Sequence, residues 1–161
     1  MSYVRGVKYL GYSFYVMKGK CQLTVHPKSK AKMKSKLKEL TSRSNGWGYA
    51  KRKQKLKEYI RGWVGYYHLA NMKRLLLVTD EWLRRRICMC IWKAWKNPKT
   101  KVANLIKCGI NKYQAYEWGN TRKGYWRIAD SYILHRAITN EYLCRAGYAT
   151  LMDAYLEWYP K

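Results

Sequence analysis

Three long stretches between residues 28 and 95 repeat apolar residues at the spacing of an α-helix, and this pattern limits the fold more than any other feature. In the first stretch, Met33, Leu37 and Leu40 recur at i, i+4 and i+7. The second runs from about residue 50 to 70 and the third from about 73 to 95, where Asn97-Pro98 ends it. The apolar face of the second helix comprises Leu56, Tyr59, Ile60, Trp63, Tyr66, Tyr67 and Ala70. Short connections between such helices predict a three-helix bundle over residues 28–98.

Shorter elements are predicted on both sides of the bundle. Residues 8–26 alternate like two strands around a turn at 17–20, which predicts a short β-hairpin in residues 1–27. An isolated hairpin is marginal in water, so these strands should pack on the helices or complete a sheet supplied by something else. Beyond Pro98, short helices are predicted at 100–108, 112–118, 125–129, 132–146 and 150–159. We expect Gly109, Gly119 and Gly147 to be helix C-caps, and residues 99–161 to form a small helical subdomain of this mainly α chain.

The charge of the chain indicates its class of partner. It carries 34 Lys and Arg against 9 Asp and Glu, a formal net charge of +25. A hydrophobic fraction of 48% argues against a disordered basic tail, because such tails lack the apolar surface that offsets ordering entropy. A folded polycation therefore predicts a polyanionic partner. The aromatic residues, mostly Tyr and Trp, also suit base stacking.

Secretion and membrane insertion are not expected. The five cysteines follow no disulfide framework, the first twenty residues lack the apolar core of a signal peptide, and there is no glycosylation sequon. The longest stretch without Lys, Arg, Asp or Glu, residues 62–72, is much shorter than the ~20 residues of a membrane helix. We therefore expect no membrane contact and a cytoplasmic location.

Two basic groups on the predicted bundle are candidates for phosphate contacts. The first helix would carry positive charge around its circumference, at Lys28, Lys30, Lys32 and Lys34. This distribution favours a face that contacts nucleic-acid phosphates over a merely solvated surface. Arg84, Arg85 and Arg86 lie about 100° apart on the third helix, so at most two share a face. Alternatively, one of these arginines pairs internally with Asp80 or Glu81, and both interpretations can hold at once.

Two further groups extend the candidate surface beyond the third helix. Lys93, Lys96, Lys99 and Lys101 could contact a nucleic-acid backbone or simply complement the helix dipole, while Trp92 and Trp95 are expected in the core. Residues 115–127 interleave aromatic rings and cations around two glycines, a composition typical of loops that stack bases and hold phosphates. Its candidate residues are Trp118, Asn120, Arg122, Lys123, Tyr125, Trp126 and Arg127. For Trp118 and Trp126, packing in a seam between subdomains remains an equal alternative.

No pattern of an active site is present in the sequence. The one adjacent acidic pair, Asp80-Glu81, should diverge on a helix, and the three histidines are isolated. Cys88 and Cys90 should point roughly 200° apart on a helix, which favours core packing over a zinc site. A glycine-rich phosphate loop is also absent. We therefore expect no catalytic residues, metal or cofactor, and no enzymatic activity of this chain by itself.

Several segments together resemble the C-terminal part of group II intron reverse transcriptases, or maturases. They are YLGYSF (9–14), the basic helix at 27–40, YIRGWVGYY (59–67), DEWLRRRICMCIWKAWKNPKTKV (80–102), AYEWGNTRKGYWRIADS (115–131) and ILHRAITN (133–140). The motifs at 61–67 and 82–96 are similar to those of the family's thumb, or maturase-specific X, domain. The segment around Trp118 is similar to the DNA-binding region of the bacterial class C subfamily. The resemblance adds Arg61, His135 and Arg136 to the candidate nucleic-acid-binding residues.

This resemblance implies a division of labour in the parent proteins. The fingers and palm, which this sequence does not contain, would carry the Tyr-Ala-Asp-Asp carboxylates and Mg²⁺, and residues 9–26 would be the last hairpin of the palm. The thumb would clamp template and primer and bind intron RNA so that it splices, in a bacterial cytoplasm. The implied partners are group II intron RNA, an RNA–DNA template–primer duplex or target DNA, and a separately encoded fingers and palm polypeptide. The alternatives are a thumb subunit acting in trans and a non-functional basic remnant.

Overall fold

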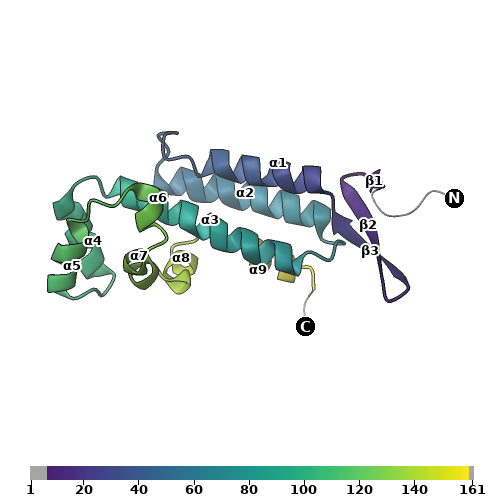
Figure 1. Ribbon diagram of the computed structural model, residues 1–161. Coiled ribbons are helices and arrows are strands. Elements are labelled where there is room, and N and C mark those ends of the chain that lie inside the picture. Colours follow the sequence, from purple (N-terminus) through teal and green to yellow (C-terminus); the bar gives the residue numbers. More distant parts are fainter. Residues whose placement is uncertain (1–6, 160–161) are drawn as a thin grey trace. The chain divides into compact units, whose positions relative to one another are not determined.

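A computed structural model describes residues 7–159 and begins with an antiparallel sheet of three strands (Figure 1). The strands are β1 (Lys8–Tyr9), β2 (Tyr12–Met17) and β3 (Lys20–Val25), in the order β1-β2-β3. The predicted hairpin is confirmed: Lys18 and Gly19 form its two-residue turn with φ of 51° and 73°, the conformation that suits tight hairpins. Strand β1 was not predicted as a separate strand; its turn into β2 at Leu10 and Gly11 also has positive φ, of 49° and 84°.

The three long helices are confirmed as α1 (Pro27–Leu40), α2 (Tyr49–Tyr67) and α3 (Lys73–Ala94). Helix α1 buries the predicted Met33, Leu37 and Leu40, and it packs against α2. The buried stripe of α2 is narrower than predicted and consists of Arg52, Leu56, Ile60 and Val64. Tyr66 belongs instead to the surface, with 52% of its area exposed. Its hydroxyl donates a hydrogen bond to the carbonyl of Leu10 at 2.9 Å.

The described residues form two compact units that share α3. The first unit comprises residues 7–40, 47–81 and 149–159, and the second comprises 41–46 and 82–148. The mainly α fold class with a small N-terminal sheet is therefore confirmed. The domain boundaries after residues 27 and 98 remain a prediction. Within residues 7–159, no helix has both the length and the apolar character that crossing a bilayer requires.

The first unit includes the last described helix, α9 (Leu151–Leu156), which packs against α2. The hydroxyl of Tyr155 donates to the carbonyl of Ala70 at 3.0 Å. Asp80 accepts hydrogen bonds from the backbone N–H groups of Leu151 at 2.8 Å and Met152 at 2.9 Å. Asp80 therefore holds the start of α9, because the first N–H groups of a helix have no partner within the helix. The expectation that Asp80 or Glu81 pairs with an arginine of α3 is wrong for Asp80.

The Asp80 carboxyl should make stability depend on pH. Burial raises its pKa from the ordinary 3.8 to about 6, and the two backbone N–H groups offset this effect only partly. Between these values the folded chain binds a proton that the unfolded chain has lost, so raising the pH from about 4 to 6 removes stability. The pKa difference of about 2 corresponds to about 3 kcal/mol. Urea unfolding at pH 4, 5 and 6 should show this decline, and Asp80→Asn should abolish it. Equal pH slopes in both proteins would contradict the assignment.

The second unit consists of the C-terminal part of α3 and five short helices. They are α4 (Pro98–Lys107), α5 (Lys112–Gly119), α6 (Tyr125–Ile128), α7 (Tyr132–Ala137) and α8 (Asn140–Arg145). Gly109 and Gly147 follow α4 and α8 with φ of 84°, as a C-cap requires. The C-cap prediction is wrong for Gly119, which is the last residue of α5. A Cβ atom there would lie 2.6 Å from Val102 Cγ2, so this glycine permits the close approach of α4 and α5.

The predicted single helix over 132–146 is wrong, because the structure divides it into α7 and α8. Ile138 leaves the helical conformation with φ of −115° and ψ of 82°. Thr139 then caps α8, its hydroxyl accepting from the N–H of Tyr142 at 3.2 Å. The Arg84 guanidinium donates to the carbonyl of Ile138 at 2.7 Å, so a side chain of α3 occupies the acceptor freed at the break.

Candidate nucleic-acid interface

The three arginines of α3 all contact the rest of the second unit. Arg84 contacts the His135 Nδ1 atom at 2.8 Å and the Ile138 carbonyl. The Arg86 Nε atom donates to the Thr41 hydroxyl at 2.6 Å and Nη2 to the Thr41 carbonyl at 3.2 Å. The carboxylate that pairs with this triplet is Asp130, on Arg85, and not the predicted Asp80. We conclude that this triplet organises the packing of the second unit.

Arg85 is the most fully engaged of the three. Its Nη1 atom lies 3.0 Å from Asp130 Oδ2, and its Nε and Nη2 atoms donate to the Trp126 carbonyl at 3.3 and 3.1 Å. The guanidinium carbon also lies 3.9 Å from the centroid of the Trp126 ring, a cation–π contact. One face of the Trp126 ring therefore packs against Arg85, in agreement with the packing alternative, while 40% of the residue remains exposed.

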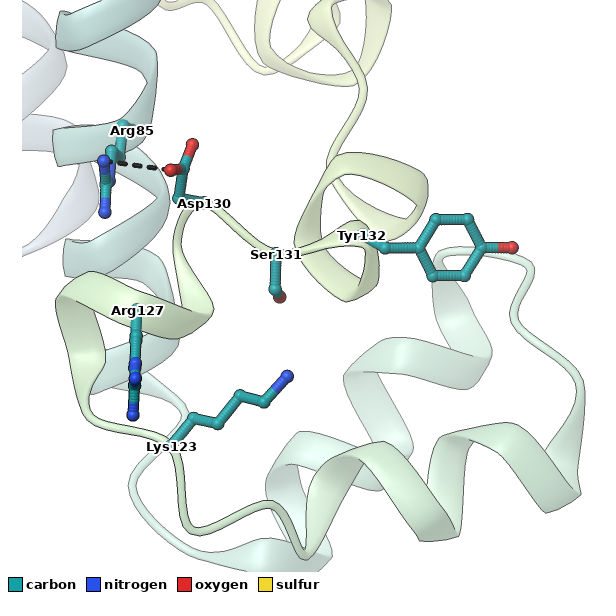
Figure 2. A pocket seen from close by; sticks show the side chains of 6 residues that line it. All are labelled: Arg85, Lys123, Arg127, Asp130, Ser131 and Tyr132. Atoms are coloured by element: carbon teal, nitrogen blue, oxygen red, sulfur yellow. Dashed lines mark ion pairs between the residues drawn. The ribbon is translucent and has the colours of Figure 1, made fainter.

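A pocket of about 610 Å³ opens beside this ion pair (Figure 2). Arg85 comes from α3, Lys123 from the loop before α6, and Arg127 from α6. Asp130, Ser131 and Tyr132 complete the lining where the chain passes from α6 into α7. Figure 2 shows Lys123 reaching towards Ser131, while the Tyr132 ring points away from the other five residues. The volume is within the ~300–1,000 Å³ typical of small-ligand sites.

The charges of the pocket divide into a neutralised pair and two available cations. Asp130 lies against Arg85, and its other oxygen is 3.7 Å from His135 Nε2. In the described part of the chain, neither the Lys123 ammonium nor the Arg127 guanidinium forms an ion pair. Two unpaired cations beside a pocket are suited to one or two phosphates, which prefer charge-assisted hydrogen bonds.

The remaining candidates of the 115–127 segment and of α7 differ in accessibility. Trp118 is only 8% exposed, and its ring meets Tyr132 edge to face at 5.8 Å between centroids, which favours the packing alternative. Tyr125 is 37% exposed and has the Arg43 guanidinium 5.0 Å from its ring centroid. Asn120 donates to the Tyr116 carbonyl, Arg136 donates to the Tyr132 hydroxyl, and Arg122 is exposed.

Sequence reasoning missed Asp130, Ser131 and Tyr132 as parts of this pocket. A signal was present, because Asp130 is an isolated acidic residue in a basic stretch and is followed directly by Ser and Tyr. The role of Asp130 could not be inferred from this signal alone, because its partner Arg85 lies 45 residues earlier in the chain.

The lysines of α1 lie on the surface of the first unit. Lys28, Lys32 and Lys34 are exposed and Lys30 is partly exposed, whereas Met33 and Leu37 of the same helix are buried. Arg61 of α2, also in the first unit, is 59% exposed. It lies 3.7 Å from Glu157 and lines a smaller pocket of about 330 Å³ with Ala154 and Trp158.

The candidates around the end of α3 divide between structural and exposed positions. Lys93 donates to the Arg43 carbonyl at 2.6 Å, and the Lys101 ammonium lies 4.8 Å from the ring centroid of Trp92. Lys96 and Lys99 are exposed. Trp92 and Trp95, at 1% and 6% exposure, are confirmed as core residues.

The described residues show no arrangement suited to a metal. Across 7–159, no group of three or more His, Cys, Asp or Glu side chains could hold a metal ion. Cys88 and Cys90 are buried, as the packing interpretation predicted. Burial raises the pKa of Cys88 to about 11, so its thiol is protonated at neutral pH.

Comparison with known families supports the resemblance for about half of the chain. Residues 30–109 match the family described as Group II intron, maturase-specific domain. This segment extends from Lys30 within α1 to the glycine that follows α4, so it includes Lys30, Lys32 and Lys34, Arg61 and the arginine triplet, whereas Lys28 lies before it. No curated protein matches the chain. The match supports a similarity to the C-terminal part of a group II intron maturase.

Proposed function

We propose that this chain is an RNA-binding module of a group II intron-encoded protein and that it assists splicing of the intron. The observation that carries this proposal is the match of residues 30–109 to the maturase-specific domain. The same segment presents Lys32, Lys34, Lys96 and Lys99 at the surface, where they can neutralise phosphates of a structured RNA. Among these cations, the α1 lysines lie in the first unit and Lys96 and Lys99 in the second.

The pocket of the second unit extends this proposal beyond the matched segment. Lys123, Arg127 and Tyr132 follow residue 109, in the region that resembles a DNA-binding segment. The positive charge of Lys123 and Arg127 suits contacts with target DNA or an RNA–DNA template–primer duplex during intron mobility. We assign the splicing role to the matched segment and this clamping role to both units.

Binding to intron RNA tests the splicing role directly. Crosslinking of the chain in its host, with sequencing of the bound RNA, should return a group II intron well above the abundance of other structured RNAs. Added to that intron in vitro, the chain should accelerate splicing at low Mg²⁺, where the RNA alone folds poorly. Equal affinity for the intron and for an unrelated folded RNA of the same length would contradict the proposal and favour a generic basic RNA-binding protein.

A thumb subunit acting in trans is the second candidate, supported by apolar side chains exposed around the sheet. Tyr9, Leu10 and Leu69 are 64%, 65% and 62% exposed. Such exposed apolar residues are typical of surfaces that meet another protein. Primer extension should then require both this chain and a separately encoded fingers and palm polypeptide. Nucleotide incorporation by this chain alone would contradict the absence of a polymerase site.

A further inference from the structure

The short segment that follows α9 is tied to the C-terminal end of α2, within the first unit. The hydroxyl of Tyr159 donates to the carbonyl of His68 at 2.6 Å. The hydroxyl of Tyr155 donates to the carbonyl of Ala70 at 3.0 Å. Between these two tyrosines, the backbone N–H of Trp158 donates to the carbonyl of Tyr155 at 3.2 Å. The position of Trp158 on α2 is therefore fixed by hydrogen bonds on both sides of it.

The indole ring of Trp158 is held on one face and also lines a pocket. It stacks on the imidazole of His68, with 4.3 Å between the ring centroids and 17° between the ring planes. His68 Nδ1 donates to the carbonyl of Gly65 at 2.6 Å, which fixes the plane of the imidazole. Trp158 remains 52% exposed, and it lines the pocket of about 330 Å³ together with Arg61 and Glu157. A ring fixed in this way loses little conformational entropy when a ligand stacks on it.

The two charged groups of this pocket are only loosely paired with each other. Arg61 Nη2 lies 3.7 Å from Glu157 Oε2, and the two side chains are 59% and 61% exposed. An exposed pair at this distance gains little net free energy, so a ligand can replace the contact. The pocket thus combines hydrogen-bond donors, a carboxylate acceptor and an aromatic ring. Its volume is near the lower end of the ~300–1,000 Å³ typical of ligand sites, which suits a single base.

Guanine is the base whose edge matches these groups. It presents two neighbouring N–H donors, at N1 and N2, beside the acceptor O6. A carboxylate such as Glu157 can accept from both donors, and a guanidinium such as Arg61 can donate to O6. Adenine and cytosine instead present an unprotonated ring nitrogen, which repels a carboxylate. Uracil offers a carboxylate only one N–H donor, so it should bind less tightly than guanine.

We propose that this pocket binds one unpaired guanine of an RNA strand, with the base stacked on Trp158 and its Watson–Crick edge bound by Glu157 and Arg61. A guanine inside a duplex cannot bind in this way, because its neighbours cover both faces and its partner base occupies the edge. The net charge of +25 favours a strand of several phosphates over a free nucleotide. This inference rests on the proposed function only in taking the ligand to be RNA.

Direct binding of short RNAs to the full chain tests the proposal. The probes are a labelled adenosine octamer and two variants with one central guanosine or inosine, all at 200 mM salt, where general phosphate contacts are weak. The guanosine octamer should bind roughly 10-fold more tightly than the adenosine octamer. Inosine lacks the 2-amino group and should be intermediate. Equal affinity for the guanosine and adenosine octamers would overturn the proposal.

Competition with free GMP distinguishes the two sources of a guanine base. GMP should displace the guanosine octamer only at a concentration much higher than the unlabelled octamer requires, because a single nucleotide lacks the other phosphates of the strand. Displacement at equal concentrations would overturn the assignment of an RNA strand and identify a free nucleotide as the ligand.

A matched pair of variants separates base recognition from general electrostatics. Glu157→Gln and Glu58→Gln each remove one exposed negative charge from the first unit, and only Glu157 lines the pocket. If charge alone mattered, both variants would bind every octamer more tightly and keep the same preference for guanosine. Glu157→Gln should instead reduce that preference to less than about threefold, whereas Glu58→Gln should leave it unchanged. The same preference in both variants would overturn the role of Glu157.

Substitution of Trp158 tests the stacking contact. Trp158→Ala should weaken binding of the guanosine octamer roughly 10-fold, and Trp158→Phe, which keeps an aromatic ring, should restore most of that loss. Because Trp158 also packs on His68, photocrosslinking to the unmodified chain gives a measurement that does not depend on folding of the variant. A guanosine octamer with 4-thiouridine next to the guanosine should crosslink to the peptide that contains Trp158.

Crosslinks confined to other peptides would overturn the proposal. The octamers contain no intron sequence, so this test and the test of the proposed function can fail separately. A guanosine preference without intron discrimination would leave the guanine site and remove the splicing role. Intron discrimination without a guanosine preference would do the opposite.

Discussion

Raising the salt concentration from 50 to 200 mM is expected to weaken binding of the chain to group II intron RNA by roughly 1,000-fold. The chain carries a net charge of +25, and both units present cations at the surface. Each phosphate that a lysine or arginine neutralises releases condensed counterions, so the logarithm of affinity falls linearly with the logarithm of salt. A loss of this size corresponds to about six neutralised phosphates. Fluorescence anisotropy at four salt concentrations measures the slope.

Two lysines of α1 provide a matched comparison for this slope. Lys32 is exposed, whereas the Lys36 ammonium lies 2.8 Å from Glu39. Lys32→Ala should reduce the slope by about one, because one phosphate contact is lost. Lys36→Ala should reduce it less, since Glu39 already offsets part of that charge. A salt-independent affinity of the unmodified chain would contradict an electrostatic phosphate interface altogether.

Arg84→Ala is expected to destabilise the second unit by about 2–3 kcal/mol and to lower the melting temperature by roughly 5–10 °C. Its guanidinium donates a hydrogen bond to the carbonyl of Ile138, a fully buried residue, and it also contacts His135. Alanine would leave a buried carbonyl without its charged donor, which costs more than an ordinary hydrogen bond. Thermal unfolding followed by circular dichroism measures the effect.

Arg127→Ala is the matched control for that prediction. Arg127 is exposed and lines the pocket, so its loss should weaken nucleic-acid binding and leave the melting temperature nearly unchanged. Together, the two variants separate arginines that support the fold from arginines available to a ligand. If Arg84→Ala reduced RNA affinity at unchanged stability, the structural role assigned to Arg84 would be wrong.

The elements that could be predicted from sequence are those whose signals are local. Met33 and Leu37 define the buried side of α1 through their spacing alone, and Gly19 marks a tight turn because it tolerates a positive φ. The extent of the buried stripe on α2 was less predictable. Tyrosine suits both a core and a surface, so Tyr66 could be assigned only when its neighbours were known.

The features that were not predictable depend on partners distant in the chain. The break at Ile138 involves Arg84, and the capping of α9 involves Asp80, 71 residues before Leu151. The exposure of the aromatic residues near the pocket was unpredictable for a similar reason, because it depends on how they pack against one another. Sequence composition pointed to Trp118, yet the fold buries that ring behind Tyr132 and exposes the tyrosine instead.

The packing of α9 on α2 has a consequence for the order in which the chain folds during synthesis. The carbonyls of His68 and Ala70 accept hydrogen bonds from the hydroxyls of Tyr159 and Tyr155, which lie 91 and 85 residues later in the chain. The whole of residues 82–148 must therefore leave the ribosome before the first unit can close. At about 5–20 residues per second, the side of α2 that α9 covers stays exposed for several seconds after α2 itself is synthesised. Translation speed through the second unit thus sets how long that apolar helix face remains open to aggregation or to a chaperone.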